Sequence, residues 1–446
     1  MVSILSSPLL VFIISLIWLL FPIIKNTFYK KKHTIEDITF YIIKAMLYFS
    51  LPRLLLIKKD LHTVMLRSVH DMIERTKDAF TTELLYINYF IVLYIVGLNI
   101  WLYIRNGKSF NINLIVRDKW YYIIILMNIG FFNLSMTISD IMYAFIFINF
   151  ILFSKFSKVF IKKIINEILL LYIYLSFLII LLKPKAAILS DGTWAGIFEN
   201  PNSLVVIVNF ILILLLLLPF FSKTTIWRYI NIALLFYIII MSGSRNGLLT
   251  FLLIILLYII IYNKLHYMYI LLLFIILPGL FWFYDIYSNL NFREITSDRS
   301  IAWAYLVSKL KGNYIFGLGY NYFSEVSRIK NFPKYLFSLT NAMNIYLEYL
   351  VRYGILGFFV LISFTVSLYN RVKQINPVLL VFVVLLVLPN MFESFFKPPN
   401  LSINNILYLL MIFIINNSWK YLRRKNLKIN FNEKHSSIIN LPQQKR

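Results

Sequence analysis

The chain has 446 residues, of which 60% are hydrophobic, 18% are aromatic and only 14% are charged. Apolar runs of roughly 15 to 22 residues recur from end to end, each long enough to cross about 30 Å of hydrocarbon, so the composition excludes a soluble protein. The net charge of +25 does not indicate nucleic acid binding, because Lys and Arg form short clusters between the apolar runs. The chain contains no cysteine, which excludes disulfides and thiolate catalysis.

The sequence predicts an all-α, polytopic transmembrane protein, with residues 1–418 as one membrane domain surrounded by lipid. Hydropathy places about 11 to 13 spans in it. The first run lacks a basic n-region and therefore predicts a span, not a cleavable signal peptide. The second is the weakest, since Lys44, Pro52 and Arg53 interrupt it, and an interfacial or re-entrant helix is the alternative. The predicted spans are 4–24, 38–57, 84–104, 119–134, 141–154, 164–183, 203–221, 227–241, 247–262, 267–284, 344–368, 377–390 and 403–418.

The distribution of basic residues predicts the orientation of these spans. Alternate loops together with the C-terminal tail hold roughly 25 of the 44 Lys and Arg residues. The positive-inside rule puts this set in the cytoplasm and the N-terminus outside. Residues 419–446 form a basic cytoplasmic tail that we expect to be disordered.

One loop, at about 285–343, is far longer than the others and falls on the outer side. Long loops in compact membrane proteins tend to be functional. Within it, "DRSIAWAYLVSKLKG" has helical apolar spacing and predicts a helix lying against the membrane, and "FGLGYNYF" follows as a glycine-rich turn. A shorter outer segment, 58–83, predicts a surface helix. No internal repeat is evident, which argues against transporters built from inverted halves.

Arg245 stands in the polar gap "SGSRNG" between two predicted spans, at the outer face. The positive-inside bias disfavours an arginine there, so it either pairs with a carboxylate, reaches lipid phosphate or binds an anionic substrate. Its neighbours are small or amide-bearing, and they leave backbone N–H groups open beside a helix N-terminus. This pattern is typical of a diphosphate cradle.

Asn344, Glu348 and Arg352 follow at i, i+4 and i+8, where the long loop returns to the membrane. They form one helical stripe descending from the outer surface. A purely structural Glu348–Arg352 pair is one interpretation. The other is that Glu348 orients or deprotonates a substrate hydroxyl while Asn344 donates hydrogen bonds to sugar or phosphate and Arg352 contributes to substrate binding.

Asn200, Pro201 and Asn202, in "GIFENPNSLV", lie at the outer entrance of the span 203–221. The local interpretation is a turn followed by a helix N-cap. The functional interpretation is that the two asparagines contribute to substrate binding.

Taken in order, "GIFENPNSLV", "SGSRNGLL", "DRSIAWAYL", "FGLGYNYF" and "NIYLEYLVRYGILG" resemble the O-antigen polymerase and O-antigen ligase superfamily of bacterial envelope glycosyltransferases, over roughly residues 185 to 370. The resemblance implies a multi-span fold in the bacterial cytoplasmic membrane, with an active site facing the periplasm or cell exterior. It also implies an undecaprenyl-diphosphate-linked glycan as the donor.

The resemblance assigns roles to particular residues. Arg245 and Arg299 match the two arginines proposed to hold the donor diphosphate in that family, and Trp303 follows the second. We expect no metal or other cofactor, since no acidic metal motif stands out on the outer side and guanidinium groups can neutralise a leaving diphosphate. Aromatic side chains of the long loop offer faces for sugar rings, although anchoring at the membrane interface explains each of them equally well. These are Trp303, Tyr320, Tyr322, Phe323 and Tyr335.

The chain departs from the ligase-type pattern at Met343, where such members carry a histidine. His62 and His70 in the segment 58–83 do not convincingly replace it, and His33, His266 and His435 fall on the cytoplasmic side. Glu348 is the better candidate base, with Glu294, Asp298 and Glu325 in the loop behind it. The missing histidine favours a polymerase over a ligase.

The sequence therefore predicts an enzyme that polymerises undecaprenyl-diphosphate-linked repeat units into O-antigen, capsular or other surface polysaccharide, with lipid-linked glycan as donor and acceptor. A chain-length regulator is an expected further partner. One alternative is a ligase that transfers finished glycan to an acceptor. The other is a lipid-linked oligosaccharide flippase, which should show repeated halves and charged residues in several spans.

Overall fold

The computed structural model describes thirteen stretches of the chain, and all statements below concern them. Within them the regular structure is helical, apart from an isolated bridge between Ile188 and Trp194. Most of the predicted first span, the span 267–284, nearly all of the segment 58–83 and the tail 419–446 lie outside them. The described residues are 17, 21, 34–50, 82–107, 117–131, 138–182, 184–189, 191–198, 200–220, 226–261, 299–323, 342–398 and 402–417.

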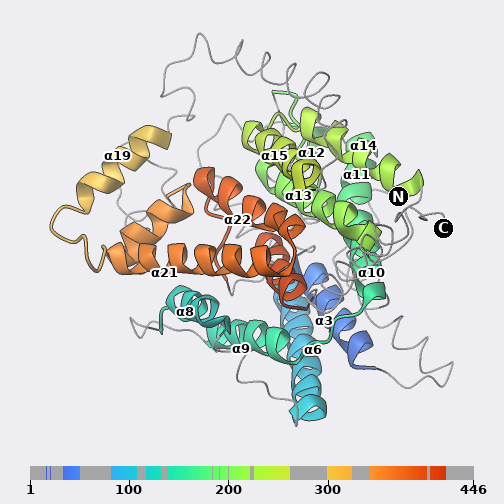
Figure 1. Ribbon diagram of the computed structural model, residues 1–446, viewed down its shortest axis with the longest axis horizontal. Helices are drawn as coiled ribbons and strands as arrows, with labels where there is room; N and C mark the ends of the chain where they lie inside the picture. Colours follow the sequence, from blue (N-terminus) through green and yellow to red (C-terminus); the bar gives the residue numbers. More distant parts are fainter. Residues whose placement is uncertain are drawn as a thin grey trace, which may run out of the picture.

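The helices follow the predicted apolar runs closely (Figure 1). They are α3 (Ile35–Ser50), α6 (Thr82–Asn106), α8 (Lys119–Asn128), α9 (Ile138–Phe153), α10 (Lys158–Ile168), η4 (Leu169–Tyr174), α11 (Leu175–Leu182), α12 (Pro184–Ala187), α13 (Pro201–Leu217), η5 (Leu218–Phe220), α14 (Ile226–Met241), α15 (Arg245–Ile261), α19 (Arg299–Lys309), α21 (Ile345–Ile375), η8 (Pro377–Leu379), α22 (Leu380–Phe392) and a last helix, Ile403–Asn417.

Three helical stretches among the described residues are long and apolar enough to cross a membrane, namely Tyr89–Asn106, Val159–Leu182 and Ile345–Ile375. Several shorter apolar helices accompany them. These findings confirm an all-α membrane protein. The number of spans stays a prediction, because some of the predicted spans fall outside the described ranges.

Helix α13 forms the centre of the helix group that carries the candidate site. Its residues from Leu204 to Leu217 are all buried, as expected for a helix that is apolar on every side. It packs against α14, α15 and α22 (Figure 1). Gly247 makes the contact with α15 close, since a Cβ atom at this position would lie 2.0 Å from Cγ1 of Val205.

Helix α21 is kinked at Gly354, where φ is +66° and ψ is −159°. A Cβ atom there would lie 2.1 Å from the carbonyl oxygen of Ile315, so the loop after α19 touches the backbone of the kink. Leu318 N–H donates to the carbonyl of Val351 (2.6 Å), and Ile355 N–H donates to the carbonyl of Tyr314 (2.8 Å). The loop therefore pairs with backbone groups that an unbroken helix would have paired internally. The sequence predicted the turn but not the kink.

Helix α19 is the amphipathic helix predicted within the long loop. Its apolar positions Ala302 and Leu306 are buried together with Leu310, and they pack with Phe323 and Val351. The expectation that this face lies against the membrane is therefore wrong. The helix covers the first turns of α21 instead, because these turns offer an apolar surface next to it in the fold.

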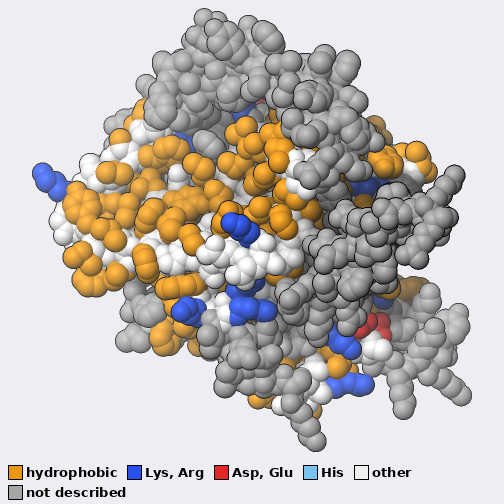
Figure 2. Space-filling view, viewed as in Figure 1, with side chains coloured by type: hydrophobic (Ala, Val, Ile, Leu, Met, Phe, Trp, Pro, Cys, Tyr) orange, Lys and Arg blue, Asp and Glu red, His pale blue; other side chains and the backbone are white. Residues whose placement is uncertain are grey.

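Apolar side chains gather on the face of the molecule shown in Figure 2, over the region of α21 and α22. Large exposed residues along α21 include Ile355, Leu356, Phe359 and Val366, each more than half exposed. A soluble protein does not expose such an apolar surface, whereas hydrocarbon covers it at no cost. The surface is consistent with a membrane-embedded helix.

Candidate functional site

The N-terminal turns of α13, α19 and α21 contact the short segment 393–397, which follows α22, and the start of α15 joins them through Asn202. Glu393 is the centre of a first set of contacts. Its Oε1 lies 2.7 Å from Nη2 of Arg299, the first residue of α19, and accepts a hydrogen bond from Nδ2 of Asn202 in the first turn of α13 (2.8 Å). Asn202 Oδ1 in turn accepts from the hydroxyl of Ser244 (2.6 Å). One carboxylate thus connects three helix N-termini.

Glu348 is the centre of a second set of contacts. Its Oε1 lies 2.8 Å from Nζ of Lys397 and 2.9 Å from Nη2 of Arg352. The Glu348 side chain is only 2% exposed, and two cations balance its charge. The predicted Glu348–Arg352 pair is therefore present, and Lys397 joins it from the segment after α22.

Arg352 extends this second set toward the loop that follows α19. Its Nη1 donates to the carbonyl of Tyr320 (3.0 Å), and its guanidinium lies over the rings of Tyr320 and Phe323, 5.4 and 5.2 Å from their centroids. The Tyr320 hydroxyl donates to the carbonyl of Asn128 (3.0 Å). Two of the predicted sugar-binding residues are therefore held in a packed arrangement around one cation.

The two sets are adjacent, because Glu393 and Lys397 belong to the same five-residue segment. Burial raises the pKa of the Glu393 carboxyl, and Arg299, Asn202 and Lys397 oppose this shift without cancelling it. Burial likewise lowers the pKa of the Lys397 ammonium, against the attraction of Glu348. For both groups burial disfavours the charged form, and the charges of their partners oppose that effect.

Arg245 is the first residue of α15 and is partly buried. It follows Ser244, whose hydroxyl contacts Asn202, and precedes Asn246, whose Nδ2 donates to the carbonyl of Pro389 in α22 (3.3 Å). Arg245 therefore starts its helix beside the elements that carry Glu393. Among the described residues, these helix ends and the segment 393–397 carry the cations Arg245, Arg299, Arg352 and Lys397 and the carboxylates Glu348 and Glu393. Such a concentration of cations favours an anionic ligand.

Small residues form the turn before Arg245, and the hydroxyl of Ser242 accepts from the N–H of Ser244 (3.3 Å), so one amide that the cradle hypothesis left open is already paired. Gly243 has a φ of +61°, and a Cβ atom there would meet the Thr193 side chain at 2.7 Å. The Ser244 hydroxyl also accepts from the N–H of Gly247 (3.3 Å). The turn thus brings α15 close to α13, and one amide of the first turn of α15 is capped by Ser244.

Three predicted site residues have local structural roles. Asn200 caps α13 by accepting from Asn202 N–H (2.8 Å), and Asn344 caps α21 by accepting from Leu347 N–H (3.1 Å). Trp303 donates from Nε1 to the carbonyl of Ala342 (2.9 Å), which ties α19 to the start of α21. These contacts account for the residues without a ligand, so their roles in substrate binding stay predictions.

Met343 precedes the cap of α21 and has a φ of +48°, which is unusual for a residue other than glycine. Its thioether cannot take a proton from a hydroxyl at neutral pH. Three acidic residues predicted to support catalysis, Glu294, Asp298 and Glu325, and all five histidines lie outside the described ranges. Glu348 and Glu393 are therefore the carboxylates that the described part of the site contains.

Sequence reasoning missed Glu393 and Lys397. Both stand in "NMFESFFKPPN" between the predicted spans 377–390 and 403–418, at i and i+4. Glu393 is the only acidic residue between Glu348 and Glu433. A lone carboxylate at the end of an apolar run is a signal that could have singled it out.

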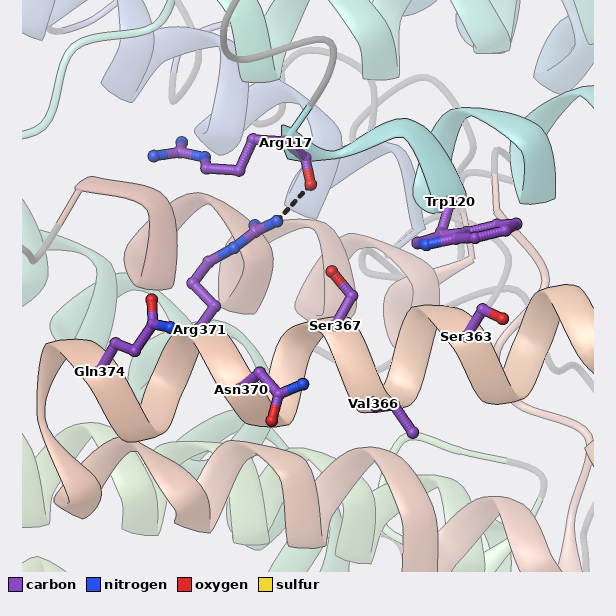
Figure 3. Close-up of a pocket in the computed structure, with 8 residues that line it drawn as sticks. All are labelled: Arg117, Trp120, Ser363, Val366, Ser367, Asn370, Arg371 and Gln374. Carbon is purple, nitrogen blue, oxygen red and sulfur yellow. Dashed lines mark hydrogen bonds between the residues drawn. The ribbon is translucent and has the colours of Figure 1, made fainter.

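A cavity of about 510 Å³ lies away from this site, along the last turns of α21 (Figure 3). Polar residues of α21, including Ser367 and Asn370, line it together with Trp120. Arg371, at its edge, is engaged by Asp118, by Asn416 Oδ1 (2.7 Å) and by the carbonyl of Arg117. None of the predicted site residues lines this cavity. Of the two arginines that line it, Arg117 and Arg371, the second links α21 to the start of α8 and to the last helix.

Comparison with known families matches residues 230–362 to the family described as O-antigen ligase. The matched stretch includes Arg245, Arg299, Trp303, Tyr320, Asn344, Glu348 and Arg352. It excludes Asn200, and it excludes Asn202, Glu393 and Lys397, which complete the two sets of contacts from outside it. No curated protein matches the chain.

Proposed function

We propose that this chain, which belongs to the superfamily of O-antigen polymerases and ligases, is a polymerase that joins lipid-linked oligosaccharide repeat units into a surface polysaccharide. The family is one of glycan-transferring enzymes that use lipid-linked glycans. The finer assignment rests on the residues of the site. Its donor and acceptor would both be undecaprenyl-diphosphate-linked glycans, and its product O-antigen, capsule or a related polymer.

The observation that carries the proposal is that Arg245, Arg299, Arg352 and Lys397 gather with Glu348 and Glu393 at helix ends in the described part of the chain. A diphosphate leaving group develops negative charge as its bond to the sugar breaks. Guanidinium groups match phosphate oxygens with paired hydrogen bonds, and helix N-termini add favourable dipoles. The arrangement therefore suits a diphosphate that must depart without a metal ion.

The reaction requires three events at the site. Arg245 and Arg299 bind the diphosphate of the donor, and a hydroxyl of the acceptor sugar attacks the donor's anomeric carbon. The bond from that carbon to the diphosphate oxygen breaks, and its electron pair leaves with undecaprenyl diphosphate. The hydroxyl proton passes to a carboxylate of the site, for which Glu348 was the residue predicted from the sequence.

Met343 favours the polymerase over the ligase within this superfamily. A chain that uses the ligase-type histidine as its base would not have a thioether at this position. The flippase alternative predicts charged residues lining a path through the bilayer, whereas the charges described here are paired at helix ends. We propose that the catalytic site faces the periplasm or the cell exterior, as the distribution of basic residues in the loops predicts, and that a chain-length regulator is a further partner.

The test is the glycan ladder on a polyacrylamide gel from a strain lacking the gene. The strain is complemented with the wild type, Arg245→Ala, Arg299→Ala or the control Arg105→Ala. Arg105 is an exposed arginine on α6 that stacks on Trp101, outside the site. We expect a single repeat unit on the surface anchor in the deletion and in the two site variants, and the full ladder with the wild type and the control.

Other results of the same gel would contradict the proposal in distinct ways. Long polymer that stays on its lipid carrier would identify a ligase, and loss of every repeat unit from the outer face would identify a flippase. Normal chain lengths in Arg245→Ala and Arg299→Ala, with each protein present in the membrane, would remove the two arginines from the site.

A further inference from the structure

Glu393 is a mostly buried carboxylate to which the proposed reaction assigns no role. Its side chain is 13% exposed, and the same oxygen atom, Oε1, accepts from Arg299 and Asn202. It lies 94 residues from Arg299 in the chain and 191 residues from Asn202. A purely structural contact does not require a carboxylate at this junction, and burying one is unfavourable unless it stays paired.

Arg299 is also the residue proposed to hold the donor diphosphate. Its Nη2 atom lies on Glu393 at 2.7 Å. A diphosphate carries more charge than a carboxylate and offers more acceptor oxygens, so it competes for the same guanidinium. Binding of the donor would therefore draw Arg299 away from Glu393.

We propose that Glu393 is the proton acceptor of the transfer reaction and that its ion pair with Arg299 holds it inactive until the donor diphosphate takes over that arginine. The inference rests on the proposed function. It assigns a role to a residue outside the family match and couples base activation to donor binding.

The two carboxylates of the site differ in a way that favours Glu393. Two cations, Lys397 and Arg352, contact one oxygen of Glu348, and neither of them is assigned to the donor diphosphate. Its charge stays balanced throughout the reaction, so it accepts a proton poorly. Glu393 loses its direct cationic partner when Arg299 turns to the diphosphate. We assign Glu348 the role of a positioning residue that holds Lys397 and Arg352.

The chemistry balances with one proton moving to Glu393. The acceptor hydroxyl oxygen forms a bond to the anomeric carbon and gives its proton to the Glu393 carboxylate. The bond between that carbon and the diphosphate oxygen breaks, and undecaprenyl diphosphate leaves with the electron pair. When undecaprenyl diphosphate departs, Arg299 returns to Glu393. The Glu393 carboxyl then loses its proton to solvent, and the ion pair re-forms.

The surroundings of Glu393 support this role. Burial raises the pKa of its carboxyl, and the charged groups facing it are Arg299 from α19 and Lys397 from its own segment. Loss of Arg299 raises the pKa further, which brings a carboxyl closer to the pH at which a general base works well. Lys397 keeps its closest partner, Glu348, and so does not replace Arg299.

Binding of undecaprenyl diphosphate to the detergent-solubilised full chain tests the first half of the proposal. The variants are Glu393→Gln, Arg299→Ala, Glu348→Gln and the control Glu167→Gln. Glu167 is also a partly buried carboxylate, 18% exposed, and it pairs with Lys44 at 3.5 Å away from the site. We expect Glu393→Gln to bind the diphosphate about tenfold more tightly, because the Glu393 carboxylate no longer competes with the diphosphate for Arg299. Arg299→Ala should bind it more weakly, and the control should match the wild type.

Transfer in membranes, with lipid-linked repeat units extracted from the deletion strain, tests the second half. We expect Glu393→Gln to slow transfer at least about 100-fold although the diphosphate binds more tightly. The rate of the wild type should rise with pH above the ordinary carboxyl range. This dependence should be absent from the residual activity of Glu393→Gln and present in Glu348→Gln.

A charge swap, Arg299→Glu with Glu393→Arg, separates catalysis from folding. If the pair is only structural, the swap restores polymer and the inference is overturned. Equal binding and normal transfer in Glu393→Gln would also overturn it, as would loss of the pH dependence in Glu348→Gln alone. These results leave the proposed function intact if Arg299→Ala still abolishes polymer. Failure of the wild type to bind undecaprenyl diphosphate would instead count against the proposed function itself.

Discussion

Buried charges decide the chemistry of this protein at the scale of single residues. Lys397 and Arg352 both contact Oε1 of Glu348, and Arg299 and Asn202 both contact Oε1 of Glu393. Removing one member of such a group leaves its partners buried and unpaired, which is costlier than never having buried them. Substitutions here therefore alter folding and function together, and tests of function need controls for folding.

Gly354 is the residue whose main chain most directly shapes the site. We expect Gly354→Ala to destabilise the protein by about 2 kcal/mol or more and to abolish transfer, because alanine is strained at φ +66° and its Cβ meets Ile315 at 2.1 Å. The strain would push the loop, and Tyr320 with it, away from Arg352. Thermal unfolding in detergent measures the change.

The matched control for this prediction is Gly97→Ala. Gly97 lies within α6, and a Cβ atom there has no other atom within 4 Å. Alanine is better than glycine in a helix by about 1 kcal/mol, so this variant should be as stable as the wild type or slightly more so. A Gly354→Ala variant that unfolds at the same temperature as Gly97→Ala would show that the loop yields to the added methyl group without cost.

Apolar runs determine where the helices of this protein begin and end, whereas polar residues make several of the contacts between helices. The predicted span 227–241 is α14, Ile226–Met241, and the predicted span 247–262 is α15, Arg245–Ile261. Which helices pack against each of them depends, in contrast, on tertiary contacts such as the close approach of α15 to α13 that Gly247 permits. Arg371 is another joining residue, since it connects the start of α8 and the last helix to α21.

We expect Arg371→Met to destabilise the folded protein by about 3 kcal/mol, because it leaves Asp118 buried without its cation. The double variant with Asp118→Leu should recover part of this loss, since it removes both charges. Thermal unfolding in detergent checks the series, with Lys373→Ala as an exposed control on the same helix, expected within about 0.5 kcal/mol of the wild type. Equal unfolding temperatures for Arg371→Met and the control would mean that the pair does not hold these helices together.

At the scale of the whole molecule, the orientation of the helices in the membrane determines on which side the site works. The absence of cysteine makes the wild type a clean background for labelling single introduced cysteines. Lys311, beyond α19, and Lys373, near the end of α21, are both exposed. We expect Lys311→Cys to react with a membrane-impermeant maleimide in spheroplasts and Lys373→Cys to react only after the membrane is opened. The reverse pattern would put the site in the cytoplasm and exclude periplasmic polymerisation.

The sequence by itself determined which segments are helical, that they enter a membrane, and that a resemblance to O-antigen polymerases and ligases covers roughly residues 185 to 370. These properties depend on apolar runs and short motifs, which are local. Tertiary structure alone decided that Glu393 meets Arg299 and Asn202, and that Lys397 joins Glu348. Hydropathy carries no information on which distant charges meet, because their pairing depends on how helices far apart in the sequence pack together.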